Sequence, residues 1–218
     1  RDGLPHRTDP VIGAVARRSG NLYHLGMLIS ELGQSARREQ ILAERAKKHI
    51  EALAEELGET VSLTLFAEGG PQKVAWHEPK RSLVYRERSD FGPSFHSTSI
   101  GKLFLSRLSP TACEEWLSTI KLDHITPASV RTVEALRRQL SEIRETGVAF
   151  SYEEAEPGLA EISLPIGLSG GETIGALTVA APLIRLERAR SDRVIAAMRK
   201  TIHAIVSRTF VNSYTLPN

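Results

Sequence analysis

The sequence predicts an α+β fold in which one mostly antiparallel sheet is flanked by helices. Helical and strand-like segments come in groups along the chain, in the order helix, three strands, three helices, three strands and helix. Strands that are grouped apart from helices are typical of this class. The chain has 218 residues, of which 41% are hydrophobic, so it can bury one sizeable core. The two groups of three strands differ in sequence, so we find no internal repeat.

The first part of the chain predicts a loop followed by a long helix. Residues 1–21 are rich in glycine, arginine and proline and have no sustained period, so we expect a loop or an extended remnant there. A short apolar segment follows, and Gly33 interrupts it. Apolar residues then recur at helical spacing over 34–57, and Gly58 stands where a C-cap glycine is expected.

Three strands are expected next. Residues 59–66 alternate between polar and apolar side chains, and strand-like segments continue over 72–77 and 81–87. Turn residues at 68–71 separate the first two strands, so the three strands should form an antiparallel meander. A glycine–proline break at 92–93 ends this group.

The middle of the chain predicts three helices. The first covers 101–108 and can be capped by the serine and threonine residues that precede it. The second begins at Pro110 and passes through Leu117. The third covers 129–146, where apolar residues share one face, and Gly147 ends it.

The last part predicts three strands and a closing helix. The strands cover 148–152, 160–166 and 173–181, with a glycine-rich turn at 167–171. Apolar residues at helical spacing predict the final helix over 187–209.

Composition argues against several classes of protein. The formal net charge is +2 and no long basic run is present, so the chain as a whole is not a nucleic-acid polycation. One cysteine, Cys113, allows no intramolecular disulfide and suits a reducing cytoplasm. No stretch approaches 18 consecutive apolar residues, so we expect no membrane span. The histidines are scattered and no metal-binding motif is present, so we expect neither a metal nor a cofactor.

Residues 95–108, FHSTSIGKLFLSRL, carry the densest group of chemically useful side chains. Ser99 and Lys102 make the spacing S-x-x-K, in which a serine nucleophile lies one helical turn from its base. The S-D-N and K-T-G motifs that accompany this spacing in acyl-transfer enzymes are absent downstream. A helix start here also exposes N–H groups and the positive end of the helix dipole, which can hold a small carboxylate. The simplest alternative is that the hydroxyl residues only cap the helix.

A second serine motif, G-x-S-x-G, covers residues 167–171. The nucleophile elbow of hydrolases needs a strand before the serine and a helix after it. Here strands are expected on both sides, so Ser169 belongs to a hairpin turn and we do not assign it a catalytic role.

At residues 95–108, and at several other segments, the sequence resembles the IclR-type transcriptional regulators. FHSTSIGKLFLSRL is similar to their segment of histidine, three small residues, any residue, glycine and lysine or arginine. LYHLGMLISELG resembles the segment that joins their DNA-binding domain to a linker helix. HITPASVRTVEALRRQLSEIRETGVAFSYEEAEPGLAEISLPI resembles their Thr-Pro, long helix, Arg-x-x-Gly strand and Glu-Glu…Gly stretch, and GALTVAAPLIRL resembles their penultimate strand. The likeness covers roughly residues 22–210.

The resemblance implies a sensor domain without catalysis. It implies a GAF-like effector-binding domain over 59–212, linker helices over 22–58, and in 1–21 a loop or the remnant of a winged helix-turn-helix domain. In such regulators a small organic acid binds the effector domain and changes the DNA affinity of a dimer or tetramer, which acts as a repressor or activator. Residues 1–21 are too few for a winged domain. The chain therefore resembles either a regulator shortened to its sensor or a natural sensor without its reader.

The resemblance also implies an effector pocket. The matched positions are Tyr85, Ser99, Ile100, Ser151, Glu161, Ser163, Thr178 and Ala180, to which we add Phe95, Ser97 and Thr98 at the same helix start. Alternation within AEISLPI places Glu161 and Ser163 on one face of a strand. The alternative for Glu161 is that it faces water.

Departures from the family pattern indicate an effector other than the smallest keto acids. Relatives that bind those acids often carry an acidic residue at the position of Ser151 and a cysteine at the position of Glu161. They also often carry serine at the two positions that Thr178 and Ala180 occupy here. Since Tyr85, Phe95 and Ile100 would form an apolar wall, we expect an aromatic or longer-chain acid or alcohol. Glu161 would accept a hydrogen bond from a hydroxyl or amine of that ligand. A serine acyl-transfer enzyme and an oligomerisation module with a closed pocket stay as alternatives.

Overall fold

The computed structural model describes residues 15–18, 22–25, 27–67, 70–86, 95–167, 173–187 and 191–210. The chain divides into two compact units, residues 1–42 and 43–218. In the first unit, strands β1 (Val15–Arg18) and β2 (Leu22–Leu25) pair in antiparallel fashion. Helix α1 (Met27–Leu57) begins in the first unit and ends in the second.

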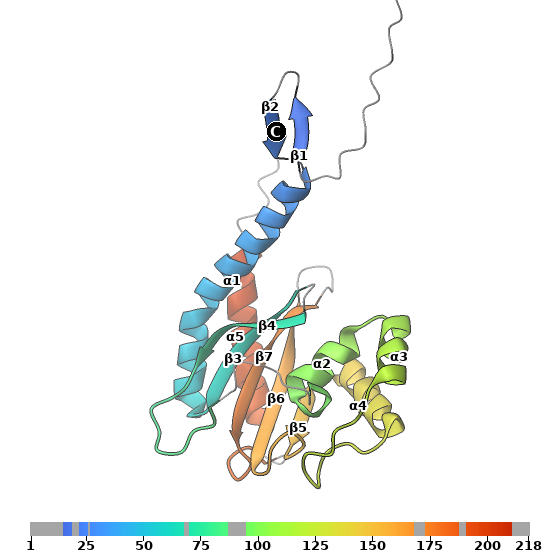
Figure 1. Ribbon diagram of the computed structural model, residues 1–218. Helices are drawn as coiled ribbons and strands as arrows, with labels where there is room; N and C mark the ends of the chain where they lie inside the picture. The colour runs from blue at the N-terminus through green and yellow to red at the C-terminus, as the bar shows by residue number, and fades with distance from the viewer. Residues whose placement is uncertain are drawn as a thin grey trace, which may run out of the picture. The chain divides into compact units, whose positions relative to one another are not determined.

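The second unit is built on one five-stranded antiparallel sheet with the strand order β4-β3-β7-β6-β5 (Figure 1). Its strands are β3 (Thr60–Ala67), β4 (Gly70–His77), β5 (Ala149–Tyr152), β6 (Leu159–Gly167) and β7 (Thr173–Pro182). Strand β3 pairs with β4, its neighbour in sequence, and with β7, the last strand among the described residues. The predicted α+β fold with an antiparallel sheet is therefore confirmed.

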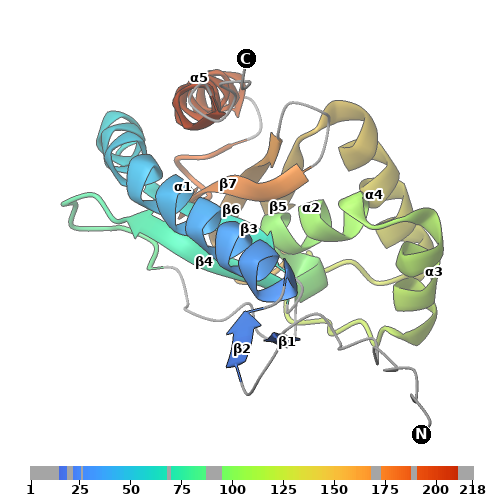
Figure 2. The same cartoon turned by 90° about the horizontal axis from the view of Figure 1, so that it is seen from above.

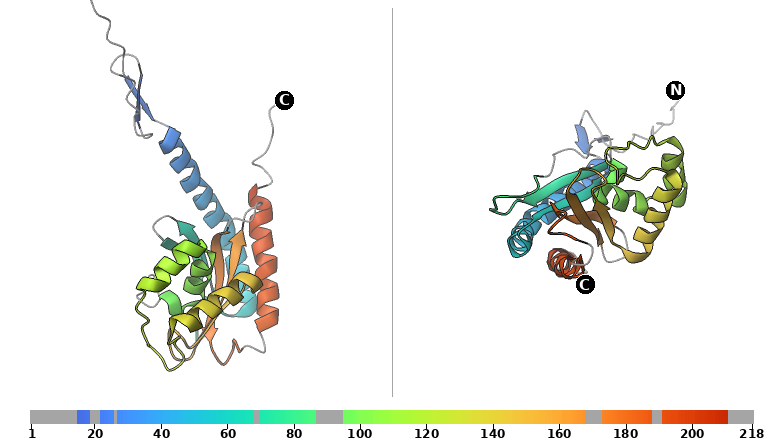
Figure 3. Two further views of the ribbon diagram at one scale, coloured as in Figure 1. Left: turned by 90° about the vertical axis from the view of Figure 1, so that its right-hand side faces the viewer. Right: turned by 90° about the horizontal axis from the view of Figure 1, so that it is seen from below.

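Helices lie on both faces of this sheet. On one face are α2 (Ser99–Arg107), α3 (Pro110–Thr119) and α4 (Val133–Thr146), with α2 lying directly against β5, β6 and β7 (Figure 2). On the opposite face α5 (Ser191–Phe210) packs against β6 (Figure 3). Among the described helices, none has the length and apolar character that a membrane span requires.

The two faces of the sheet differ in chemistry because side chains alternate along each strand. The face toward α5 is apolar and almost fully buried, with Val61, Leu63, Leu65, Ile162, Leu164, Leu177 and Val179 at 3% exposure or less. The face toward α2 carries polar and small side chains in cross-strand rows. One row is Thr60, Ala180, Glu161 and Ser151, and the next is Ser62, Thr178, Ser163 and Ala149.

Apolar side chains fix α2 onto its neighbours α3 and α4. The cluster is buried and contains Leu103, Leu105, Leu117, Leu136 and Leu140. Cys113 lies in the same cluster at 3% exposure, so its thiol packs as a small core side chain. This packing sets the height and direction of α2 over the polar face of the sheet.

The strand expected over 81–87 does not form. The described part of this segment, residues 81–86, has no regular secondary structure. Side chains bind the carbonyl groups that a strand would use for pairing. The Thr60 hydroxyl donates to the carbonyl of Tyr85, and Arg185 Nη2 donates to that of Leu83 at 2.9 Å. The sheet therefore has five strands rather than six.

Helix α1 begins earlier than the sequence pattern predicted. It runs without a break through Gly33, where a glycine inside a helix costs only about 1 kcal/mol relative to alanine. Residues 22–25, which we expected within the linker helices, form β2 instead.

Helix α4 begins later than the expected residue 129. The Ser129 hydroxyl donates to the Glu154 carbonyl at 2.8 Å, so Ser129 belongs to a separate turn that is tied to the strand region. Thr132 then caps the helix, and its hydroxyl accepts from the Ala135 amide at 3.1 Å. Gly147 ends α4 as predicted, with a φ of 70°.

Several expectations concern residues outside the described ranges. These include the break at 92–93, the beginning of the final helix at 188–190, most of the turn at 167–171, and most of residues 1–21. Strand β6 ends at Gly167 and β7 begins at Thr173, so strands flank the G-x-S-x-G motif on both sides, as predicted.

Candidate functional site

The candidate site begins with the local structure of the α2 N-terminus. A short 3₁₀ turn over Phe95–Ser97 leads into Thr98, whose backbone is extended and whose hydroxyl accepts from the Gly101 amide at 3.0 Å. The same hydroxyl donates to the Phe95 carbonyl at 2.9 Å. A Cβ atom at Gly101 would overlap that carbonyl oxygen, so this turn requires glycine. Capping therefore uses only Thr98 and leaves the hydroxyls of Ser97 and Ser99 for other contacts.

A chain of three buried hydroxyls connects α2 to the sheet. Ser99 Oγ hydrogen-bonds to Ser163 Oγ on β6 at 2.7 Å, and Ser163 Oγ hydrogen-bonds to Thr178 Oγ1 on β7 at 2.7 Å. None of the three residues is more than 1% exposed. Three predicted pocket residues from three separate elements are thus brought together.

Glu161 is buried beside this chain rather than facing water. It is 4% exposed, and its Oε2 accepts a hydrogen bond from the Ser99 backbone amide at 3.1 Å. The Ser99 amide is one of the N–H groups that a helix leaves without an internal partner, and the helix dipole makes this end favourable for an anion. The carboxylate of the protein itself therefore occupies the position that the sequence analysis assigned to a ligand carboxylate.

Three further hydroxyls on this side of the sheet are buried without a hydrogen-bond partner among the described residues. They are Ser97 Oγ at the helix start and Ser62 Oγ and Thr64 Oγ1 on β3. A buried polar group that lacks a partner costs about 1–3 kcal/mol, so such a group usually faces water or a ligand. Sequence reasoning missed Ser62 and Thr64, although their alternation with apolar residues in β3 places them on the same face as Thr178 and Ala176.

Four other predicted pocket residues divide between the polar face of the sheet and the apolar cluster beside α2. Ser151 Oγ donates to the Ser97 carbonyl at 2.7 Å, and Ala180 stands next to Glu161 in the cross-strand row. Ile100 and Phe95 belong to the apolar cluster between α2, α3 and α4.

Tyr85 lines a separate cavity of about 190 Å³. That cavity is bounded by the segment 83–85, the loop before β6 and the end of β7. Among its lining residues are Leu83, Pro157 and Pro182.

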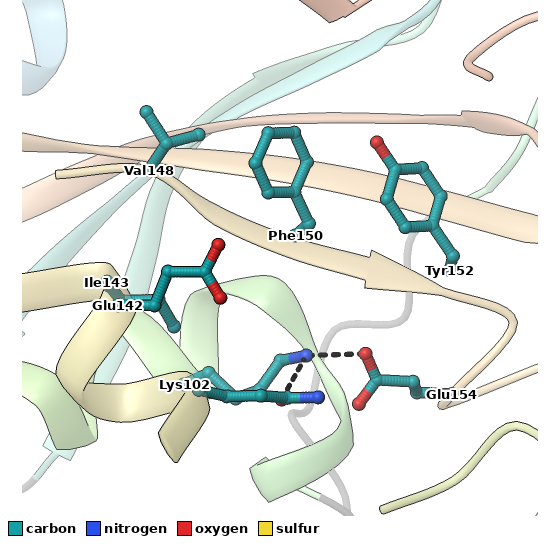
Figure 4. Close-up of a pocket in the computed structure, with 8 residues that line it drawn as sticks. Lys102, Glu142, Ile143, Val148, Phe150, Tyr152 and Glu154 are labelled. Atoms are coloured by element: carbon teal, nitrogen blue, oxygen red, sulfur yellow. Dashed lines mark hydrogen bonds and ion pairs between the residues drawn. The ribbon is translucent and has the colours of Figure 1, made fainter. Parts of the chain in front are cut away.

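Lys102 forms a buried ion pair one turn along α2. Its ammonium group donates to Glu154 Oε1 at 2.6 Å and to Gln139 Oε1 at 3.0 Å, and its side chain is only 2% exposed (Figure 4). Burial lowers the pKa of Lys102 and raises the pKa of Glu154, while Glu161 adds a favourable charge interaction with Lys102. The ammonium group is thus held between the polar face of the sheet and a second, smaller cavity.

That cavity measures about 120 Å³ and lies between α2, α4 and β5 (Figure 4). Its lining residues are Lys102, Gln139, Glu142, Ile143, Val148, Phe150, Tyr152 and Glu154. Within the described part of the chain, no group of three histidine, cysteine or acidic side chains is arranged to hold a metal.

The S-x-x-K spacing does not assemble a nucleophile with its base. The Ser99 hydroxyl bonds to Ser163, whereas the Lys102 ammonium group bonds to Glu154 and Gln139. A general base must lie within hydrogen-bond reach of the proton that it removes, and Lys102 is directed elsewhere.

Comparison with known proteins found a matching family, similar sequences and similar structures. Residues 34–207 match the family described as "Bacterial transcriptional regulator IclR C-terminal". The HTH-type transcriptional regulator BhcR of Paracoccus denitrificans is 28% identical over 194 residues, which cover 85% of this chain and 68% of that protein.

Two solved structures with aromatic acids also resemble the chain. An IclR homolog from Microbacterium hydrocarbonoxydans, complexed with 4-hydroxybenzoate, has a TM-score of 0.69 and 23% identity, with coverage of 91% of this chain and 80% of that chain. The inducer-binding domain of the Acinetobacter transcription factor PobR, a double mutant in complex with 3-hydroxybenzoic acid, has a TM-score of 0.64 and 25% identity. The match covers 72% of this chain and 93% of that domain.

Proposed function

Because the chain belongs to the IclR family of bacterial transcriptional regulators, we propose that residues 59–212 act as its effector-binding domain and bind a small organic acid. The observation that carries this proposal is the buried polar face of the sheet under α2. Hydroxyls from α2, β3, β6 and β7 converge there, and Ser62, Thr64 and Ser97 have no hydrogen-bond partner among the described residues. Buried polar groups in proteins nearly always have a hydrogen-bond partner, so the three that lack one support a ligand or water at this face.

The proposed binding residues are those that the family resemblance implies, with two additions from β3. Those at the polar face are Ser97, Thr98, Ser99, Ser151, Glu161, Ser163, Thr178 and Ala180, together with Ser62 and Thr64. Tyr85 lines the separate cavity, and Phe95 and Ile100 belong to the apolar cluster, so these three residues lie outside the proposed site. Hydroxylated aromatic acids are the ligands named for the two similar structures, which supports an aromatic acid here.

We propose that the ligand acts through linkage. A ligand that binds one arrangement of α2 and the sheet more tightly shifts the population of a dimer or tetramer toward that arrangement. Helix α1, as the linker, would carry the change to winged helix-turn-helix domains and so alter DNA affinity. The β1–β2 pair is consistent with a wing, and this supports assigning the segment before α1 to such a domain. The differential affinity of the ligand limits the size of the effect.

Thermal unfolding of the chain in the presence of each member of a panel of aromatic and aliphatic carboxylates tests the proposal. A ligand at about one hundred times its Kd adds about 2.7 kcal/mol to stability. For a domain of this size the melting temperature should rise by roughly 2–4 °C per kcal/mol. Ser163→Ala should reduce the shift, and Ser118→Ala on the exposed surface of α3 serves as the matched control.

The two alternatives give different results in the same experiments. An oligomerisation module with a closed pocket would give no shift across the whole panel. A serine acyl-transfer enzyme would be labelled at Ser99 by an acylating probe, whereas a sensor domain would not react there. The hydrogen bond from Ser99 to Ser163 favours the sensor domain.

A further inference from the structure

The charge at the α2 N-terminus restricts which end of a ligand can approach it. The Thr98 hydroxyl accepts a hydrogen bond from the Gly101 amide, and the Glu161 carboxylate accepts one from the Ser99 amide. Two of the first amides of the helix therefore already have acceptors from the protein. A ligand carboxylate at this place would have to displace Glu161 or lie against it. Two like charges in contact repel strongly in a site that excludes water.

The neighbouring charges do not relieve this conflict. Lys102 attracts Glu161, but its ammonium group donates to Glu154 and Gln139. Glu154, Glu161 and Glu142 all attract Lys102, so three carboxylates and one ammonium group give the region a formal charge of −2. A ligand hydroxyl or amino group fits this environment, because a carboxylate can accept several hydrogen bonds at once.

Neutral hydroxyl donors lie elsewhere on the same face and suit the opposite end of a ligand. Ser62 Oγ and Thr64 Oγ1, both on β3, are buried without a hydrogen-bond partner among the described residues. On the sheet, Ser62 is one row and two strands away from Glu161. Ideal strand geometry puts the two Cα atoms roughly 12 Å apart, too far for a two-carbon acid to reach both side chains, whereas a ring can separate two polar ends.

We infer that the effector is a hydroxylated or amino-substituted organic acid that presents its hydroxyl or amino group to Glu161 and its carboxylate to the hydroxyls of the sheet. Glu161 thus selects for a hydrogen-bond donor and against acids that lack one. This inference rests on the proposed function and specifies the ligand class for the same site.

Calorimetric titration with 4-hydroxybenzoate and benzoate tests the inference in the unaltered chain. The two probes differ only in the hydroxyl group, and hydrogen bonds to charged groups correspond to roughly 10- to 100-fold in affinity. We expect 4-hydroxybenzoate to bind tighter by that factor. Equal affinity of the two probes would overturn the inference and leave the proposed function standing.

The variant Glu161→Gln provides a test by gain of binding. It removes the negative charge at nearly constant volume, so the affinity for benzoate should rise by about tenfold or more and the preference for 4-hydroxybenzoate should shrink. Glu156→Gln removes an exposed charge from the loop before β6 and is the matched control. An unchanged ratio of affinities in Glu161→Gln would contradict the inference. Absence of binding by every carboxylate of the wider panel would instead count against the proposed function itself.

Discussion

Replacement of Lys102 by methionine should destabilise the effector-binding domain strongly. The Lys102 side chain is 2% exposed and that of Glu154 is 10% exposed, so solvent does little to screen their charges. Lys102→Met would leave Glu154 buried without its cation and would remove the attraction of Lys102 for Glu161. Loss of one partner from a buried pair costs about 3–5 kcal/mol, which corresponds to roughly 6–20 °C in melting temperature.

Urea unfolding of Lys102→Met, Glu154→Gln and the double variant measures this coupling. The double variant should be more stable than Lys102→Met alone, because it no longer buries an unpaired carboxylate. The exposed pair between Lys47 and Glu44 gives a comparison, and Lys47→Met should cost no more than about 0.5 kcal/mol. A loss of less than about 1 kcal/mol in Lys102→Met, with additive behaviour in the double variant, would show that the buried ion pair does not stabilise the domain.

Three further predictions concern the start of α2. Gly101→Ala should destabilise the chain by several kcal/mol in denaturant unfolding, because a Cβ would overlap the Phe95 carbonyl; wild-type stability would show that the turn can move. Thr98→Ala should cost about 1 kcal/mol and Thr98→Ser much less, and equal losses would contradict a capping role for the hydroxyl. Burial lowers the pKa of His96 in the fold, so the unfolded chain binds more protons below about pH 6.5 and stability should fall as pH drops through that range. In His96→Asn this part of the pH dependence should disappear, and an unchanged profile would assign it to other groups.

Local patterns in the sequence predicted most of the fold. Alternating side chains predicted β3, β6 and β7, and Gly147 marked the end of α4, because both signals depend only on residues close in the chain. The strand expected over 81–87 failed for the opposite reason. Its carbonyls are bound by Thr60 and Arg185, which are distant in sequence, so nothing within the segment could reveal the competition.

The candidate site was less accessible to sequence reasoning. The family resemblance predicted that Ser99, Ser163 and Thr178 line one pocket, and in the structure hydrogen bonds join their three hydroxyls. The position of Glu161 on the Ser99 amide depends on how β6 lies under α2, which no local pattern determines. The S-x-x-K spacing was misleading because the partner of Lys102 lies 52 residues later in the chain.

A crystal structure of the chain with 4-hydroxybenzoate would show directly whether the polar face under α2 is the effector site. We expect the ring to lie between α2 and the polar face of the sheet, with its hydroxyl within hydrogen-bond distance of Glu161. Its carboxylate should contact the hydroxyls of Ser62 and Thr64 on β3. A ligand bound instead in the cavity beside Lys102 and Glu154, with the polar face unchanged, would contradict the assignment of that face as the effector site.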